Sequence, residues 1–160
     1  MRKVLICFAF VLGSKASAEE GVIAAWGDSL TQGYGLDAAD GFVPQLQSWA
    51  IAQGADVTLI NAGVSGDTTA GGLSRAAWTL TPDVDALIVT LGGNDLLRGL
   101  DPSVSRANLT GIMEAAEAAG VKVLLVGMKA HGNYGPDFKD RFDAIYPDLA
   151  AQFGALYQNS

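Results

Sequence analysis

Cysteine, histidine and basic side chains are scarce in this chain of 160 residues, which contains one Cys and one His. A single cysteine cannot form an intramolecular disulfide, so the chain is not a small disulfide-stapled scaffold. Lys and Arg number 10 against 17 Asp and Glu, and this acidic balance argues against nucleic-acid binding, which depends on basic side chains that neutralise phosphates. Charged residues make up only 17% and hydrophobic residues 49%, a composition too apolar for a disordered tail. At about 100–200 residues per domain, the length suits one domain.

The longest apolar run occupies residues 4–12, directly after Arg2 and Lys3. Small residues then lead to Ala18, and this order of a basic start, an apolar run and a small-residue site is typical of a secretory signal peptide. The run is about half the roughly 20 residues that span a bilayer, so we expect no stable membrane anchor. We predict that residues 1–18 are cleaved after Ala18 and that residues 19–160 form the mature domain, in the periplasm or outside the cell. Its net charge would be −10, because cleavage removes three basic residues from a chain of net charge −7.

Four short apolar runs alternate with segments of helical periodicity along the rest of the chain. None of these runs alternates polar with apolar residues, which is typical of strands buried on both faces of a parallel sheet. In the first helical segment, residues 42–53, one apolar stripe carries Phe42, Leu46, Trp49 and Ala50. The alternation predicts an α/β fold with three layers, αβα, around a central parallel sheet. The predicted strands are 22–26, 57–60, 86–91 and 121–126, and the other predicted helices are 103–119 and 137–153.

Turn-forming and small polar residues follow every predicted strand. Because ligands bind beyond the carboxyl ends of the strands in such sheets, we expect the functional site there. The segments concerned are 27–30, 61–68, 92–95 and 127–131.

Three of these segments carry motifs that resemble those of a known family. Gly-Asp-Ser-Leu at 27–30, Gly-Val-Ser-Gly-Asp-Thr at 63–68 and Gly-Gly-Asn-Asp at 92–95 are similar to the first three blocks of the SGNH (GDSL-type) ester hydrolases, in their arylesterase, thioesterase I and lysophospholipase-like branch. The resemblance implies a flavodoxin-like strand order, 2-1-3-4-5, and a small-molecule ester or thioester as substrate. It implies no metal and no organic cofactor.

Ester hydrolysis needs a nucleophile, a base that activates it and hydrogen-bond donors for the developing oxyanion. Ser29, at the end of the first predicted strand, is the candidate nucleophile. The resemblance implies three oxyanion donors: the backbone N–H groups of Ser29 and Gly66 and the side-chain amide of Asn94. Each has a structural alternative, since Ser29 suits a helix cap, Gly66 a turn and Asn94 a position with positive φ. Asp28 and Asp67 are interpreted as residues that cap helices and shape turns.

The base is the part of this chemistry that the sequence lacks. The family carries Asp-x-x-His after its fifth strand, and the sequence contains no such motif. Its one histidine, His131, follows the fourth predicted strand and has Met128 three positions earlier, so we interpret it as an exposed loop residue. A base at His131, partnered by Asp137 or Asp140, is the alternative.

The sequence stops at residues 155–160, where the family's fifth strand begins. We therefore predict that the last strand and the C-terminal helix are missing, which would leave 121–127 as an open sheet edge. The leading hypothesis is a serine ester hydrolase that works through an acyl-enzyme on Ser29, with severely reduced activity because the base is absent. The alternatives are a catalytically inactive relative that binds acyl groups or esters, and an unstable truncated product.

Overall fold

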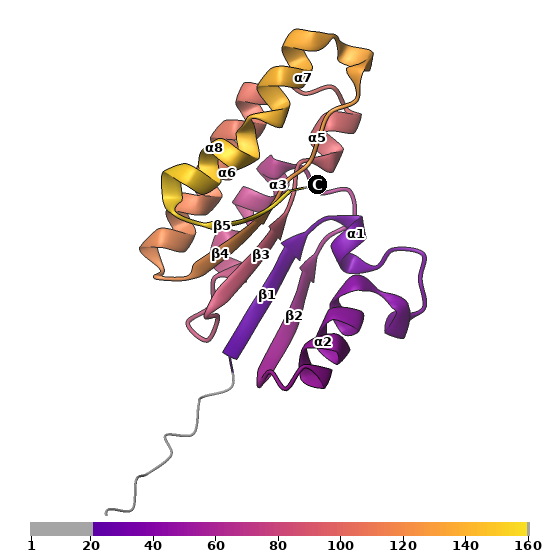
Figure 1. Ribbon diagram of the computed structural model, residues 1–160, viewed down its shortest axis with the longest axis vertical. Helices are drawn as coiled ribbons and strands as arrows, with labels where there is room; N and C mark the ends of the chain where they lie inside the picture. Colours follow the sequence, from indigo (N-terminus) through magenta and orange to yellow (C-terminus); the bar gives the residue numbers. More distant parts are fainter. Residues whose placement is uncertain (1–20, 160) are drawn as a thin grey trace, which may run out of the picture.

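The computed structural model describes residues 21–159, and the predicted signal peptide at 1–18 lies outside them. Its centre is a sheet of five parallel strands in the order β2-β1-β3-β4-β5 (Figure 1), which confirms the flavodoxin-like order. Helices flank this sheet, so the predicted α/β class is also confirmed. The strands are β1 (Gly21–Gly27), β2 (Val57–Gly63), β3 (Ala86–Thr90), β4 (Lys122–Val126) and β5 (Leu156–Gln158).

Helical segments connect the strands in chain order. The predicted helix at 137–153 is divided into two helices that meet at Ala144. Pro147 falls in the first turn of the second helix, where its missing N–H is not needed for an intrahelical bond. The segments are α1 (Ser29–Gln32), η1 (Ala38–Asp40), α2 (Phe42–Ala52), α3 (Thr69–Ser74), α4 (Ala76–Thr79), α5 (Gly93–Leu97), α6 (Pro102–Ala118), η2 (Gly132–Tyr134), α7 (Pro136–Asp143) and α8 (Ile145–Phe153).

The hydrophobic core lies between the sheet and the helices that follow β2, β3 and β4. From the sheet it contains alternate residues of three strands, including Trp26, Val89 and Leu125, all fully buried. The helices contribute Leu109, Ile112, Met113 and Ala116 of α6, together with Phe142, Ile145 and Leu149 of α7 and α8. These helical residues are the apolar stripes that the sequence predicts.

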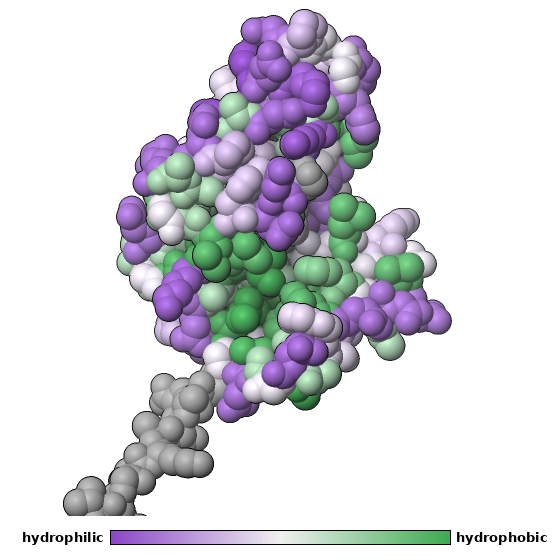
Figure 2. All heavy atoms as spheres, in the orientation of Figure 1, coloured by the Kyte–Doolittle hydropathy of each residue, from purple (hydrophilic) through white to green (hydrophobic). Residues whose placement is uncertain are grey.

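The opposite face of the sheet is also apolar, and it is less completely covered. Ile88 lies beside Leu124 and Leu124 beside Leu156 in the strand register, so these three side chains share one face. Ile88 is 9% exposed, whereas Leu156 at the edge is 71% exposed. Figure 2 shows apolar side chains gathered over the strands in the middle of the view, with polar residues around them.

The first edge of the sheet is β2, and here the expected burial on both faces is wrong. The predicted run at 57–60 has only β1 as a neighbour, and Ile60 is 39% exposed. The open backbone edge is partly paired by Gln47 of α2, whose Nε2 donates to the C=O of Val57 at 2.7 Å. Its Oε1 accepts from the N–H of Leu59 at 2.6 Å. A side chain therefore takes the place of a further strand.

The contact of Gln47 with the strand edge also rotates α2 from its predicted orientation. Val43, Gln47 and Ala50 are spaced by four and three residues, so they lie on one side of the helix. Val43 and Ala50 are buried, whereas the predicted stripe residues Phe42 and Trp49 are 41% and 61% exposed. The prediction for Ala50 is confirmed, and those for Phe42 and Trp49 are wrong.

The other edge of the sheet carries β5, which corrects the prediction that the last strand is missing. Gly154 ends α8 in the left-handed conformation and turns the chain back along β4. Leu156–Gln158 then pairs with Leu124–Val126, and the N–H of Gly127 donates to the C=O of Gln158 at 2.8 Å. The strand has three residues, but it covers the carboxyl half of β4 that was predicted to be an open edge.

Candidate active site

The carboxyl ends of β1, β2 and β3 lie level at one end of the sheet. Gly27 is the register partner of Gly63 in β2 and of Thr90 in β3. The N–H of Val64 donates to the C=O of Gly27 at 3.0 Å, which ties the loop after β2 to the end of β1. The three motif segments therefore leave the sheet side by side, at the place where ligands bind in such sheets.

Ser29 is the first residue of α1, and its side chain is half-buried. The helix is capped by Asp28, whose Oδ1 accepts from the N–H of Leu30 at 3.0 Å. The prediction of Asp28 as a cap is confirmed, and the alternative of Ser29 as the cap is wrong. Among residues 21–159, neither the hydroxyl nor the backbone N–H of Ser29 has a hydrogen-bond partner, so both are available to a ligand.

Gly63 allows α1 to pack directly on the end of β2. A Cβ at this position would lie 2.3 Å from the backbone nitrogen of Gln32, a distance that real Cβ atoms do not show. On the other side of the helix, the hydroxyl oxygens of Thr31 and Thr90 are 2.6 Å apart and join α1 to β3. These contacts fix the helix that begins with Ser29 against the sheet.

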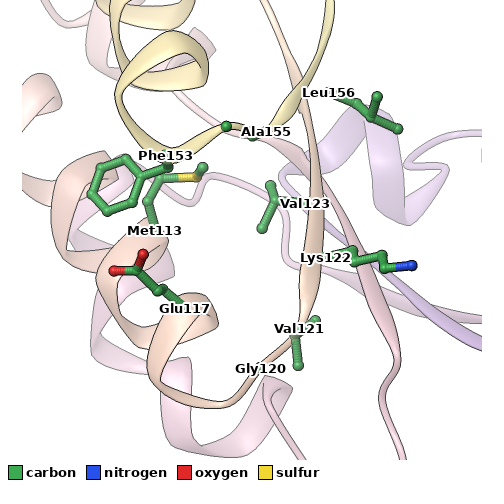
Figure 3. A pocket seen from close by; sticks show the side chains of 10 residues that line it. Met113, Glu117, Gly120, Val121, Lys122, Val123, Phe153, Ala155 and Leu156 are labelled. Carbon is green, nitrogen blue, oxygen red and sulfur yellow. The ribbon is translucent and has the colours of Figure 1, made fainter.

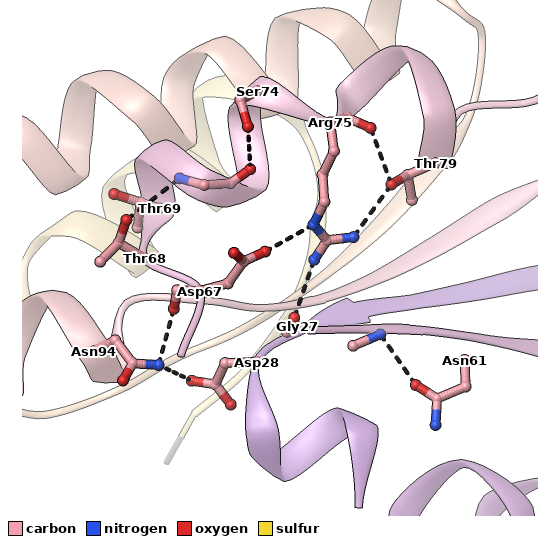
Figure 4. Close-up of polar contacts among 12 residues, drawn as sticks. Gly27, Asp28, Asn61, Asp67, Thr68, Thr69, Ser74, Arg75, Thr79 and Asn94 are labelled. Carbon is pink, nitrogen blue, oxygen red and sulfur yellow. Dashed lines mark hydrogen bonds and ion pairs between the residues drawn. The ribbon is translucent and has the colours of Figure 1, made fainter. Parts of the chain in front are cut away.

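Asn94, the second residue of α5, lies between the other two motif segments. Its Nδ2 donates to the C=O of Asp67 at 2.8 Å and contacts Oδ2 of Asp28 at 3.4 Å (Figure 4). Glycines are the only described residues with positive φ, so the alternative of Asn94 as a positive-φ position is wrong. One amide group therefore bridges the residue before Ser29 and the residue after Gly66.

Gly66 is exposed and has a φ of 82°, so its interpretation as a turn glycine is confirmed. Its C=O accepts from Nη2 of Arg98 at 2.9 Å. Its N–H, by contrast, donates to no acceptor within the described residues. The turn interpretation and the predicted role as a donor are therefore compatible, because this turn leaves the N–H free.

Comparison with known proteins places this geometry in a family. Residues 25–159 match the GDSL-like Lipase/Acylhydrolase family. The chain belongs to this family. Esterase TesA of Pseudomonas aeruginosa is 41% identical over 155 residues, which are 95% of this chain and 77% of TesA. The arylesterase of Vibrio mimicus is 35% identical over 153 residues, 94% of this chain and 75% of the arylesterase.

The fold agrees with this assignment. The crystal structure of AlinE4, an SGNH-hydrolase family esterase, matches with a TM-score of 0.84 and 46% sequence identity. The match covers 88% of this chain and 76% of AlinE4. The chain thus spans about three quarters of the length of these two relatives and of AlinE4.

Asp95 supports the site from the interior, and no prediction assigned it a role. Its side chain is fully buried and accepts three hydrogen bonds. The N–H of Thr69 donates at 2.8 Å, the Thr69 hydroxyl at 2.5 Å and the Ser105 hydroxyl at 3.0 Å. Successive residues of a helix point in different directions, so Asp95 cannot face the same side as Asn94. A second polar residue directly after Asn94 was therefore a signal that this side chain could point into the protein. Its partners could not be found from the sequence.

Asp67 does not cap the helix that follows it, so that part of its interpretation is wrong. The cap of α3 is Thr68, whose Oγ1 accepts from the N–H of Gly71 at 3.3 Å. The Asp67 carboxylate instead forms an ion pair with Arg75, with Oδ2 2.7 Å from Nε. Arg75 is a second residue at the site that the motifs do not indicate.

Tyr146 lies in the interior directly below the residues that follow β3. Its side chain is fully buried, and its hydroxyl donates to the C=O of Leu91 at 3.0 Å. Burial raises the pKa of Tyr146 far above its ordinary value, and the negative charges of Asp95 and Asp28 raise it further. The phenol therefore stays protonated and holds the strand end in place as a hydrogen-bond donor.

Exposed apolar side chains lie on or next to the two short helices that carry Ser29 and Asn94. Leu30 and Tyr34 are 76% and 77% exposed, and the N–H of Tyr34 donates to the C=O of Ser29 at 3.1 Å. Across the site, Leu97 is 79% exposed, and its C=O accepts from the Tyr134 hydroxyl at 3.4 Å. Exposed apolar groups gathered around a polar centre are suited to an apolar ligand group.

His131 is an exposed loop residue, as predicted, and it lies directly before η2. Its suggested partner Asp137 lies 3.6 Å from Arg141 in an ion pair instead. In the part of the chain that the structure describes, no basic group contacts the Ser29 hydroxyl. The same residues contain no group of three or more His, Cys, Asp or Glu side chains that could hold a metal ion.

A cavity of about 430 Å³ lies at the other end of the sheet (Figure 3). Its walls come from the end of α6, the amino end of β4 and the end of α8, with Met113, Val121 and Phe153 among the lining residues. Glu117 and Lys122 are the charged residues in this lining. Its lining contains no serine, threonine or cysteine, and the cavity is separate from the strand ends that carry Ser29.

Proposed function

We propose that this chain hydrolyses small carboxylic esters or thioesters through an acyl-enzyme on Ser29. The observation that carries the proposal is a group of polar atoms without partners on the motif segments that leave the sheet side by side. Within the described residues, the N–H groups of Ser29 and Gly66 donate to nothing, and Asn94 holds its amide between the segments that carry them. Membership of an acylhydrolase family and the names of the esterase relatives support the same reaction.

The reaction follows from these groups. Ser29 Oγ attacks the carbonyl carbon as its proton passes to water, and the carbonyl oxygen becomes an oxyanion. The bond to the alcohol or thiol then breaks as that group takes up a proton from water. The N–H groups of Ser29 and Gly66 would donate to the oxyanion. Asn94 keeps one strong bond at 2.8 Å, whereas its contact with Asp28 at 3.4 Å is weak enough to be exchanged for the oxyanion. Water then hydrolyses the acyl-serine and restores the hydroxyl.

The rate is expected to be low, because no base contacts Ser29 among residues 21–159. In serine proteases, loss of the triad leaves about 10³–10⁴-fold catalysis over water, which comes from the oxyanion donors and binding. We propose activity above this level, by the amount that attack of the Ser29 hydroxyl adds, and far below that of a complete triad, for the described part of the chain. The same observation favours a second candidate function, in which the site binds esters without turnover.

Release of p-nitrophenol from p-nitrophenyl acetate tests the proposal. Ser29→Ala should lower the protein-dependent rate to the level that the oxyanion donors and binding supply without a nucleophile. Asn94→Ala should lower the wild-type rate about 10²–10³-fold by removing one oxyanion donor. Ser48→Ala is the matched control, since Ser48 is an exposed serine of α2 whose hydroxyl bonds only to the C=O of Pro44 at 2.9 Å. This control should leave the rate unchanged.

The outcome that refutes serine catalysis is equal hydrolysis by the wild type and Ser29→Ala. Titration calorimetry with a non-hydrolysable ketone analogue then decides the second candidate. Saturable binding to both proteins supports an ester-binding function, and the absence of binding excludes it.

We also propose that the protein is exported, on the basis of the signal-like residues 1–18. None of the helices in residues 21–159 is long and apolar enough to cross a membrane. Expression of the full chain followed by cell fractionation and N-terminal sequencing tests this proposal. A mature protein that begins at Glu19 supports it, and an uncleaved protein retained in the cytoplasm contradicts it.

A further inference from the structure

Arg75 extends from the end of α3 to the end of β1 and to the loop after β2 (Figure 4). Its side chain is 19% exposed, and all three nitrogens of its guanidinium have partners. Nε lies 2.7 Å from Oδ2 of Asp67, Nη2 donates to the C=O of Gly27 at 3.0 Å, and Nη1 contacts Oγ1 of Thr79 at 3.4 Å. The guanidinium carbon also lies 5.6 Å from the ring centre of the buried Trp26.

Two of these partners are close in sequence to the reacting groups. Gly27 precedes Ser29 by two residues, and Asp67 directly follows Gly66. The planar guanidinium presents its donors at fixed angles, so it holds two acceptors at a fixed separation. The contact with Thr79 and the position of the guanidinium over the Trp26 ring restrain its rotation.

We propose that Arg75 is a positioning residue that sets the separation between the Ser29 segment and the Gly66 segment. The proposal rests on the function proposed above. Asp67 carries the effect further, because its C=O accepts from Asn94 while its carboxylate is held by Arg75. All three oxyanion donors are thus connected, through one or two intervening residues, to a single guanidinium that does not touch the substrate.

Steady-state hydrolysis of p-nitrophenyl acetate by Arg75→Gln and Arg75→Lys tests this role, with the Ser29→Ala rate subtracted as background. Arg75→Gln should lower kcat about 100-fold, because a donor displaced by about 1 Å costs a factor of that order. KM should stay within about twofold, since substrate binding does not involve the guanidinium. Arg75→Lys should recover about tenfold of the loss, because an ammonium group can meet one of the two acceptors but lacks the planar fork.

Arg106→Gln is the matched control. Arg106 forms an ion pair with Asp148 at 2.7 Å in which both side chains are substantially exposed, and within residues 21–159 it has no hydrogen bond or ion pair with the three motif segments. Its kcat should stay within twofold of the wild type. Rates are scaled to the folded fraction from urea melts. A scaled kcat of Arg75→Gln within twofold of the wild type, or a loss that resides in KM, overturns the proposal.

Failure of the proposed function is recognised separately. If Ser29→Ala hydrolyses as fast as the wild type, serine catalysis is refuted and the amide NMR signals of Gly66 and Ser29 become the readout. Both signals should shift in Arg75→Gln and stay in place in Arg106→Gln if the guanidinium positions these segments. Unchanged Gly66 and Ser29 signals in Arg75→Gln overturn the positioning role itself.

Discussion

Replacement of Asp95 by Asn should destabilise the fold strongly, although the two side chains have almost the same shape. The Asp95 carboxylate is fully buried and accepts from the N–H of Thr69, the hydroxyl of Thr69 and the hydroxyl of Ser105. Thr69 opens α3 directly after the loop that contains Gly66. The substitution therefore perturbs the support of the site without creating a cavity.

The magnitude follows from the hydrogen bonds. An Asn side chain offers one acceptor oxygen where the carboxylate offers two. If this oxygen faces the two hydroxyls, the amide group of Asn points at the N–H of Thr69, donor against donor. If it faces that N–H, the two hydroxyl protons lose their acceptor. Each bond to a charged group contributes about 1.5–3 kcal/mol, so the loss of one to two such bonds predicts about 2–4 kcal/mol.

Urea unfolding followed by tryptophan fluorescence measures this loss. With a slope of about 1–3 kcal/mol per M, the midpoint should fall by roughly 1–2 M while the slope stays unchanged. Asp148→Asn is the matched control, because Asp148 is 56% exposed in its ion pair with Arg106. Exposed pairs contribute about 0–1 kcal/mol, so the control should unfold close to the wild type. An Asp95→Asn protein within about 1 kcal/mol of the wild type would refute the argument that this carboxylate is an essential acceptor.

Three further substitutions test other parts of the structure. Gly66→Ala should cost about 1–2 kcal/mol in urea unfolding, because its φ of 82° is unfavourable for a residue with a Cβ. Tyr146→Phe should cost about 1–3 kcal/mol in the same assay, because the C=O of Leu91 loses its buried donor. Hydrogen bonds from the Ser103 hydroxyl and N–H lower the pKa of Asp101 to about 2, below its ordinary value near 3.9. Its stabilising contribution is therefore complete at pH 5 and should be lost as the pH falls towards 2. Thermal melts of the wild type should show this loss, and melts of Asp101→Asn should lack it.

The sheet could be predicted because its signals are local. Apolar runs of four to six residues mark β1 to β4, and the resemblance supplies their order. β5 was wrongly predicted to be missing because the sequence stops soon after the strand begins, and three residues, Leu156–Gln158, are enough to pair with β4. The orientation of α2 escaped prediction because it depends on Gln47, a polar residue whose partners lie 10 and 12 positions away. The apolar pattern of a helix does not predict its orientation when a polar side chain of that helix bonds to the sheet edge.

The motifs located the candidate site but not its supports. Ser29, Gly66 and Asn94 come together because the parallel strands that precede them end at the same level. The supporting roles of Asp95 and Arg75 could not be predicted by the same reasoning, because they depend on partners on other elements. An isolated Arg or Asp in a sequence is consistent with an exposed charge, and only packing decides whether it is buried.

The loop after β2 is the part of the site where these supports converge. Arg75 holds it through the side chain of Asp67, Asn94 through the C=O of Asp67, and Asp95 through Thr69. A loop of small residues with an exposed glycine would be mobile without such contacts, because glycine gives its backbone little restraint. An oxyanion donor, however, is effective only if it is already oriented before the charge develops. The contacts of Arg75 and Asp95 are therefore the physical condition for the oxyanion role proposed for the exposed Gly66 N–H, and substitutions of these two residues should reduce the rate although neither touches the substrate.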